Sequence, residues 1–422
     1  MSSLAFSLSF VTFFLLTLCL RFWLGLRHIR HVARNRAAVP ADFAATVPLA
    51  AHQKAADYTI AKTRFGLASL VWNGLLLIGF TLFGGLQLLS GAVLHWAGPG
   101  MLHQLGLVVA FALVSGVLDL PFDWYRQFVL EQRFGFNKMS LGLWVADMVK
   151  GALLGAVIGL PLLWVILTLM AKTGALWWLW AWVVWVVFQL ALTALAPTLI
   201  LPLFNKFTPL ADEALKERIE GLMKRVGFAS KGLFVMDGSR RSAHGNAYFS
   251  GFGSHKRIVF FDTLIARLAP NEIEAVLAHE LGHFKLKHIV KRITVMFLLS
   301  LGFLALLGYL KTRIWFFTGL GVDPMMGDSN DAMALILFML VLPIFTFVLS
   351  PLNSITSRKH EFEADAFAAK HTDYRDLVSA LVKMYEDNSS TLTPDPLHSA
   401  FFDSHPPASV RVRHLTLSKG AA

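Results

Sequence analysis

The residues best suited to chemistry in this chain are His279, Glu280 and His283, which stand in the string HELGH. Pro270 and the acidic residues that follow it are typical of the first turn of a helix. On a helix the two histidines are four residues apart and share a face, so both imidazoles can bind one zinc ion. Glu280 then stands where a general base can act on water at the metal. An amphipathic helix can also contain this pattern by chance, but a candidate third ligand elsewhere in the chain favours the metal site.

The residues that follow the HELGH string indicate which subclass of zinc protease the chain can belong to. A metzincin has Gly three residues after the second His and a further His three residues later, and this chain has Leu286 and Ile289 there. His288 is another potential ligand, but a helix that continued through it would point it away from the pair, so we expect a structural or supporting role. The lysines and arginines at 285–292 place the string at or outside the membrane interface, which argues against an intramembrane zinc protease.

An acidic string after the last apolar run supplies the candidate third ligand. Glu361 and Asp365 are four residues apart and share a helix face, while Glu363 points elsewhere. Glu361 can bind zinc, and Asp365 can accept the free N–H of a ligand histidine and so fix its tautomer. A solvated acidic helix surface is the alternative interpretation. We favour the ligand, because the string is predicted on the same side of the membrane as the HELGH helix.

The elements that position these residues are mostly membrane helices. Of 422 residues, 55% are hydrophobic and 15% are charged, against about 25% charged in soluble domains. The net charge of +11 is explained by basic loops on one side of a membrane, so no nucleic-acid partner is expected. A helix needs about 20 mostly apolar residues to cross a bilayer. Seven runs are expected to do so: Met1–Leu20, Leu67–Leu94, Gln104–Phe122, Gly151–Met170, Ala175–Ala196, Ile293–Leu310 and Ala332–Ser357.

Charge predicts the orientation and the domains. Loop 21–65 contains eight Lys or Arg and two Asp, which places it in the cytoplasm and the N-terminus outside. Segments 205–292 and 358–422 then lie on the cytoplasmic side, and loop 311–331 lies outside. We expect an N-terminal membrane region with five spans (1–204), the first part of a protease domain (205–292), two further spans (293–357) and the second part of that domain (358–422). The fold class is therefore an all-α integral membrane protein of about seven helices with a split cytoplasmic α+β metalloprotease domain.

Several separate strings resemble the zinc CAAX prenyl endopeptidases, the type I CAAX proteases. The resemblance covers most of the chain from about residue 60 onward. It is carried by Phe128–Lys138, Leu201–Leu210, Asn246–Phe252, the HELGH string, Glu361–Asp365 and Ser404–Pro407. The family implies seven helices that enclose a large water-filled chamber with the zinc site at its cytoplasmic end.

The resemblance also assigns roles to single residues. His279, His283 and Glu361 match the ligands of one zinc ion, Glu280 the general base and Asp365 the acid that supports a ligand histidine. His405 matches a histidine that stabilises the oxyanion, a role that preorganised donors perform well. Arg411 matches a basic residue that contacts substrate, and Asn246 lies on an edge that pairs with extended substrate. Short strands are expected near Asn246 and over Arg257–Phe261.

The sequence thus predicts a zinc endopeptidase of the bilayer that removes the C-terminal tripeptide of membrane-associated proteins, with or without a prenyl group. It would reside in the inner membrane if bacterial and in the endoplasmic reticulum if eukaryotic. A broad quality-control protease would use the same site, and a metal-stabilised membrane scaffold is an alternative of another class. An intact Glu280 argues against the scaffold, because a structural zinc site needs no base.

Overall fold

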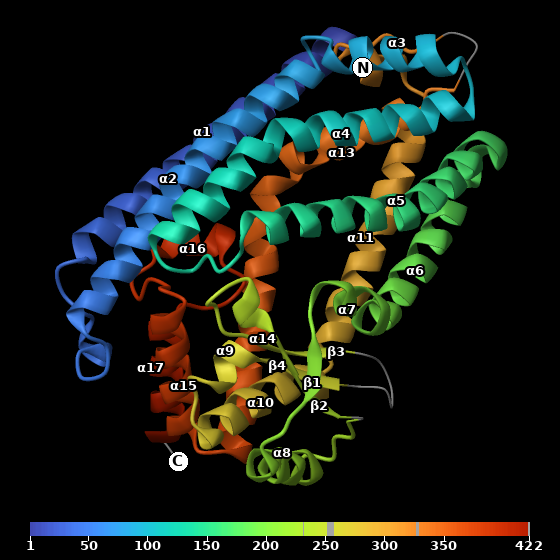
Figure 1. Cartoon of the computed structure of the whole chain (residues 1–422). Coiled ribbons are helices and arrows are strands. Elements are labelled where there is room, and N and C mark those ends of the chain that lie inside the picture. The colour runs from blue at the N-terminus through green and yellow to red at the C-terminus, as the bar shows by residue number, and fades with distance from the viewer. Residues whose placement is uncertain (231, 251–256, 326–328, 421–422) are drawn as a thin grey trace.

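Seven long apolar helices form the membrane part of the protein, as the sequence predicts. The computed structural model describes residues 1–230, 232–250, 257–325 and 329–420, so the end of the Asn246–Phe252 string and part of loop 311–331 lie outside the described residues. The N-terminus lies at the membrane end of the molecule and the C-terminus at the opposite, polar end (Figure 1). The spanning helices are α1 (Ser3–Asn35), α2 (Leu49–Phe80), α4 (Met101–Tyr125), α5 (Leu141–Lys172), α6 (Trp177–Leu195), α11 (His288–Leu310) and α13 (Asp331–Thr346).

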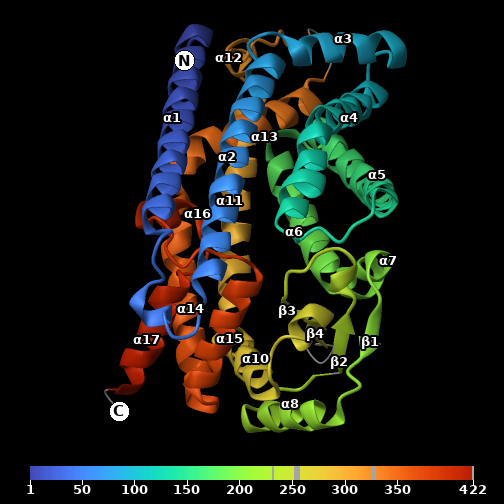
Figure 2. The same ribbon diagram turned by 60° about the vertical axis from the view of Figure 1, so that its left-hand side comes forward.

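The second expected span, Leu67–Leu94, is wrong as a single helix. Helix α2 ends at Phe80 and a separate helix, α3 (Gly85–Ala97), lies across the end of the bundle (Figure 2). A Cβ on Gly85 would lie 2.7 Å from the carbonyl oxygen of Gly79, and Gly84 has a φ of +77°. Only glycines fit so tight a turn. The turn is as apolar as its flanking helices, so hydropathy alone does not reveal it.

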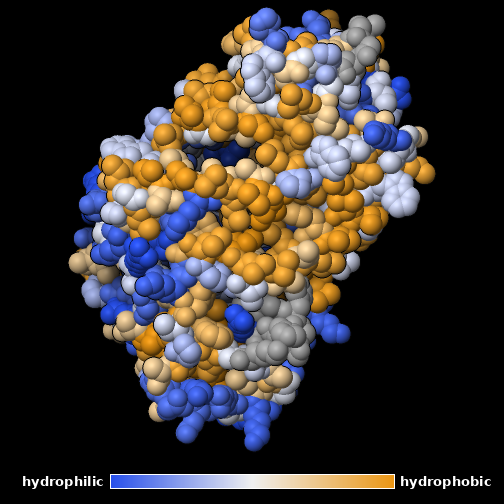
Figure 3. Space-filling view, turned by 45° about the vertical axis from the view of Figure 1, so that its right-hand side comes forward, coloured by the Kyte–Doolittle hydropathy of each residue, from blue (hydrophilic) through white to orange (hydrophobic). Residues whose placement is uncertain are grey.

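The membrane helices surround internal space that contains polar groups. A cavity of about 360 Å³ between α1, α2, α4 and α13 is lined by Arg21, Asn73 and Asp119 among apolar side chains. Charged groups at this depth are stable only where they face one another or water. A larger cavity of about 960 Å³ also reaches Arg21 and continues to His405 and Arg411 in the polar part. On the face shown in Figure 3, hydrophobic residues cover most of the membrane part, and hydrophilic residues gather at the lower, polar end and along the left side.

A small mixed sheet and a set of helices form the polar part. Its strands lie in the order β1 (Phe207–Pro209), β2 (Leu233–Met236), β4 (Arg257–Phe261), β3 (Ala247–Ser250), with β2 and β4 parallel and the other pairs antiparallel. The two strands expected near Asn246 and at Arg257–Phe261 are therefore present, and β3 is an edge strand. The helices are α7 (Leu201–Phe204), α8 (Glu213–Arg225), α9 (Asp262–Ile265), α10 (Pro270–Lys285), α14 (Ser350–His371), α15 (Tyr374–Asp387), α16 (Pro396–Phe402) and α17 (Ala408–Gly420), and α12 (Ile314–Thr318) lies at the far end of the membrane part.

Segments far apart in the sequence share one core in the polar part. Ile219 of α8, Phe260 of β4 and Leu281 of α10 are fully buried together with residues of α14, α15 and α17. Helix α10 therefore lies between the sheet and the helices that follow the last span. Helix α14 joins the last span to the polar part, because it continues from α13 through a single 3-10 turn at Phe347–Leu349 (Figure 1).

Candidate active site

Helix α10 carries the HELGH string and is fixed at both ends. Pro270 occupies the first turn, and Glu272 accepts a hydrogen bond from the backbone N–H of Ala269 at 2.7 Å, which satisfies one free donor of the helix start. The carboxylate of Glu272 also contacts Lys383 of α15 at 2.7 Å. The helix ends at Lys285, and Lys287 turns the chain with a φ of +57°. Ten of its 16 residues are buried, including His279, so their side chains have little freedom.

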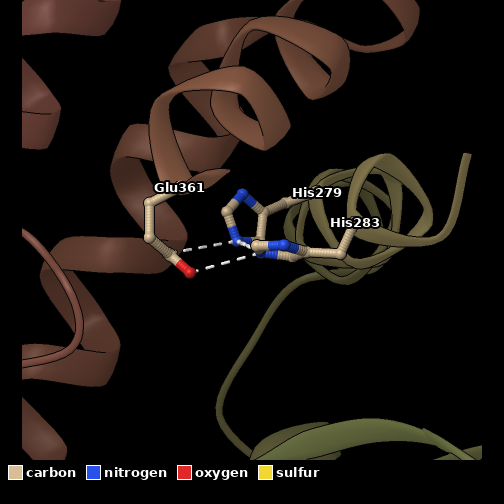
Figure 4. Close-up of side chains that lie close together, drawn as sticks. All are labelled: His279, His283 and Glu361. Atoms are coloured by element: carbon tan, nitrogen blue, oxygen red, sulfur yellow. Dashed lines mark hydrogen bonds and ion pairs between the residues drawn. The ribbon is translucent and has the colours of Figure 1, made fainter. Parts of the chain in front are cut away.

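His279, His283 and Glu361 meet at one point between α10 and α14 (Figure 4). The two Nε2 atoms are 3.2 Å apart, and the Glu361 carboxylate oxygens lie 3.5 Å from His279 Nε2 and 3.3 Å from His283 Nε2. Tetrahedral ligands at zinc bond lengths of 2.0–2.1 Å are separated by about 3.4 Å. Among the described residues, the buried Glu361 Oε2 has only long contacts of 3.5 Å, with His279 Nε2 and Arg411 Nη1, and no hydrogen bond of normal geometry. A buried carboxylate oxygen with so little hydrogen bonding is explained if it binds a metal ion.

Behind the cluster, Asp365 and Arg411 support His279. Asp365 Oδ1 lies 2.8 Å from His279 Nδ1, and Arg411 donates two hydrogen bonds to the same carboxylate at 2.9 and 2.5 Å. Burial and the charge of Arg411 oppose protonation of His279, but hydrogen bonds to Asp365 and Glu361 outweigh them and raise its pKa to about 9. Its Nδ1–H is thereby held on Asp365, which leaves Nε2 directed at the metal position. Metal binding then displaces the second proton.

The remaining predicted residues line a cavity of about 350 Å³ at the cluster, namely Glu280, His405, Asn246 and Arg411. In the described part of the chain, no hydrogen bond or ion pair holds the Glu280 carboxylate, and it lines the cavity. His405 is 63% exposed, and its Nε2 lies 3.4 Å from Glu361 Oε1, beside the metal position. Ser404 Oγ contacts the other ring nitrogen at 2.9 Å. The Arg411 guanidinium reaches the cavity but is bound to Asp365.

The structure also brings in Glu363, to which we gave no role from the sequence. The sequence predicts His288 on a continuation of the HELGH helix, but that helix ends at Lys285, and His288 begins α11 after the turn at Lys287. The turn brings its ring back to His283, with the two Nδ1 atoms 3.1 Å apart. His288 Nε2 lies 2.8 Å from Glu363 Oε2. No glycine marks the turn, so the sequence offers no signal for this contact.

Together, the fold and the site define a membrane-embedded metalloprotease. Residues 28–206 match the family model described as the CAAX prenyl protease N-terminal region with five membrane helices, and residues 209–418 match peptidase family M48. The chain therefore belongs to the M48 peptidase family.

The chain is similar to known relatives over most of their length. A CAAX prenyl protease 1 homolog of Arabidopsis thaliana is 41% identical over 77% of each chain, and CAAX prenyl protease 1 of Saccharomyces cerevisiae is 37% identical over 86% of this chain and 85% of the relative. The crystal structure of S. mikatae Ste24p superposes with a TM-score of 0.91 at 31% identity, and the match covers 97% of this chain and 99% of that one. The predicted family and fold class are confirmed.

Proposed function

We propose that this chain is a zinc endopeptidase that removes the C-terminal tripeptide of membrane-associated Cys-a-a-X proteins. The observation that carries the proposal is the spacing of His279, His283 and Glu361, which fits three ligands of a tetrahedral zinc ion and leaves the fourth position to the cavity. The substrate class follows the relatives named CAAX prenyl protease 1.

The side chains around the ligands supply the proton transfers. Zinc bound here would contribute Lewis-acid activation of water and of the scissile carbonyl. The Glu280 carboxylate takes a proton from the attacking water and delivers it to the leaving amide nitrogen. His405 Nε2–H donates to the oxyanion that develops on the carbonyl oxygen. Asp365, held by Arg411, keeps His279 in the tautomer that binds metal.

The substrate backbone is held beside the ligands by the sheet edge. Strand β3 pairs with β4 on one side, and within the described strands nothing pairs with its other side. Asn246 stands at the start of β3 and lines the cavities at about 350 and 960 Å³. An extended peptide can add to this edge through backbone hydrogen bonds, with its membrane-anchored end toward the spanning helices. In this arrangement Asn246 contacts the peptide, and Arg411, whose guanidinium is bound to Asp365, lines the cavity in which the peptide lies.

The site faces the cytoplasm in our proposal. Arg27, Arg30 and Arg34 lie at the end of α1 that adjoins the polar part, where Arg27 pairs with Asp395 at 2.9 Å. Basic residues favour the cytoplasmic end of a span. We expect a C-terminal tag to be cleaved by protease added to inside-out vesicles and to be protected in right-side-out vesicles.

The direct test is cleavage of a labelled Cys-a-a-X peptide, with and without a prenyl group, by protein purified in detergent. Wild type should release the last three residues, as read by mass spectrometry, and Glu280→Gln should release none while it retains zinc. Glu217→Gln, an exposed acid on α8, is the matched control and should cleave at the wild-type rate. Cleavage of unrelated membrane peptides in place of the Cys-a-a-X peptide would indicate a quality-control protease instead.

A further inference from the structure

The ring nitrogen of His283 that points away from the ligand cluster begins a row of polar contacts. His283 Nε2 faces His279 and Glu361, whereas its Nδ1 lies 3.1 Å from Nδ1 of His288. The other nitrogen of His288, Nε2, lies 2.8 Å from Glu363 Oε2. The row therefore runs from the metal position through two imidazoles to a carboxylate on α14.

The direction of each hydrogen bond follows from the metal. A histidine that binds metal through Nε2 carries its proton on Nδ1. That N–H of His283 must donate to His288, so His288 Nδ1 is an acceptor without a proton. The proton of His288 is then on Nε2, where it donates to the carboxylate of Glu363. Each group thus fixes the tautomer of the one before it.

We propose that Glu363 and His288 are positioning residues that hold His283 in the tautomer and orientation required for metal binding. This inference rests on the proposed zinc site and adds to it. The two ligand histidines are then supported differently: His279 contacts a carboxylate directly at 2.8 Å, whereas His283 reaches one through a second imidazole. Groups that hold ligands in this way typically contribute 10- to 100-fold to metal affinity.

The surroundings of His288 restrict it to this role. Its side chain is 3% exposed, and its ring stacks on His360 at a centroid distance of 4.1 Å and an angle of 11°. His288, His360 and Glu363 are close enough to form a second metal cluster. However, a metal binds in the plane of an imidazole, and one ion cannot lie in the planes of two stacked, nearly parallel rings. The arrangement therefore favours the relay over a second metal.

The test measures metal affinity rather than activity. Zinc dissociation constants are obtained by competition with a chelator for wild type, His288→Phe, Glu363→Leu and the double variant, and cobalt absorption spectra report ligand geometry. We expect affinity to fall 10- to 100-fold in His288→Phe and about 10-fold in Glu363→Leu, with altered cobalt spectra. Because both residues act through one path, the double variant should bind no more weakly than His288→Phe. His360→Phe keeps the stacked ring and should retain wild-type affinity.

Four results would overturn the inference. Wild-type affinity in Glu363→Leu would show that the carboxylate does not act on His283, and multiplied effects in the double variant would show two independent roles. Equal melting-temperature losses in the metal-free variants, with unchanged cobalt spectra, would indicate a merely structural role. If His360→Phe lowered the metal content from two ions to one, a second metal site would replace the relay. No zinc binding by wild type would instead refute the proposed function, and the inference with it.

Discussion

Substitution of Gly282 by alanine should separate the two helices that carry the ligands. A Cβ at this position would lie 3.0 Å from Ala364 Cα and 3.1 Å from Phe367 Cβ, both on α14. Favourable contacts between carbon atoms are about 3.5–4.0 Å. The helices must therefore move apart by about 0.5 Å. Bonds in a metal site tolerate only about 0.2 Å, so Glu361, three residues before Ala364, should no longer meet the histidines at ligand distance.

We expect Gly282→Ala to lower stability by about 1–3 kcal/mol, as overpacked cores do, and to weaken zinc affinity at least 10-fold. Chelator competition and thermal unfolding in detergent measure the two effects. The matched control is Gly221→Ala on α8, where the nearest atom is the flexible end of Arg225 at 3.7 Å. Alanine there should be neutral or stabilising by about 0.5–1 kcal/mol. If Gly282→Ala bound zinc like wild type, close contact of α10 with α14 would not set the ligand geometry.

Two further predictions concern stability. Burial disfavours ionised Glu272, but its hydrogen bond from Lys383 and its other contacts lower the pKa of its carboxyl below the usual 4.5. Its contribution to the stability of the fold is therefore full above pH 4.5 and is lost as the pH falls through the lowered pKa. Glu272→Gln should thus lower the free energy of unfolding by about 1–3 kcal/mol at pH 7, seen as a lower melting temperature, and by less below pH 4.5. A loss of melting temperature that did not depend on pH would contradict this account. Arg241 of the polar part pairs with Asp147 of α5 at 2.8 Å, with both side chains mostly buried. Arg241→Ala should lower the free energy of unfolding by about 1.5–3 kcal/mol, as measured by thermal unfolding. Arg240→Ala, the control at an exposed position, should lower it by less than about 0.5 kcal/mol. Similar losses in the two variants would show that the Arg241–Asp147 pair does not join the two parts.

Hydropathy predicts the number of spanning helices but not where each begins and ends. Helix α2 begins at Leu49, well before its apolar run, because its polar first turns continue beyond the membrane. Its end at Phe80 depends on the close approach of Gly85 to the backbone, and the adjacent pair of glycines was the available signal. A scale that scores polarity does not report backbone conformation.

The site was predictable where local spacing determines geometry. The four-residue interval places His279 and His283 on one face of α10, and the same interval places Glu361 and Asp365 on one face of α14. The role of Glu363 was not predictable, since it depends on a left-handed residue at Lys287 that returns the chain to His283. Lysine rarely adopts this conformation, and no motif announces it.

The path of the chain through the membrane makes α11 and α13 an insertion within the protease core. The insertion leaves at Leu286, directly after the HELGH helix, and returns through α14, the helix that carries Glu361. A soluble fragment made by trimming at either helix would therefore lose the register between the ligands. A soluble form requires a designed bridge that begins after His288, which supports His283, and ends at Ser350, so that α10 and α14 stay in contact without the two spanning helices.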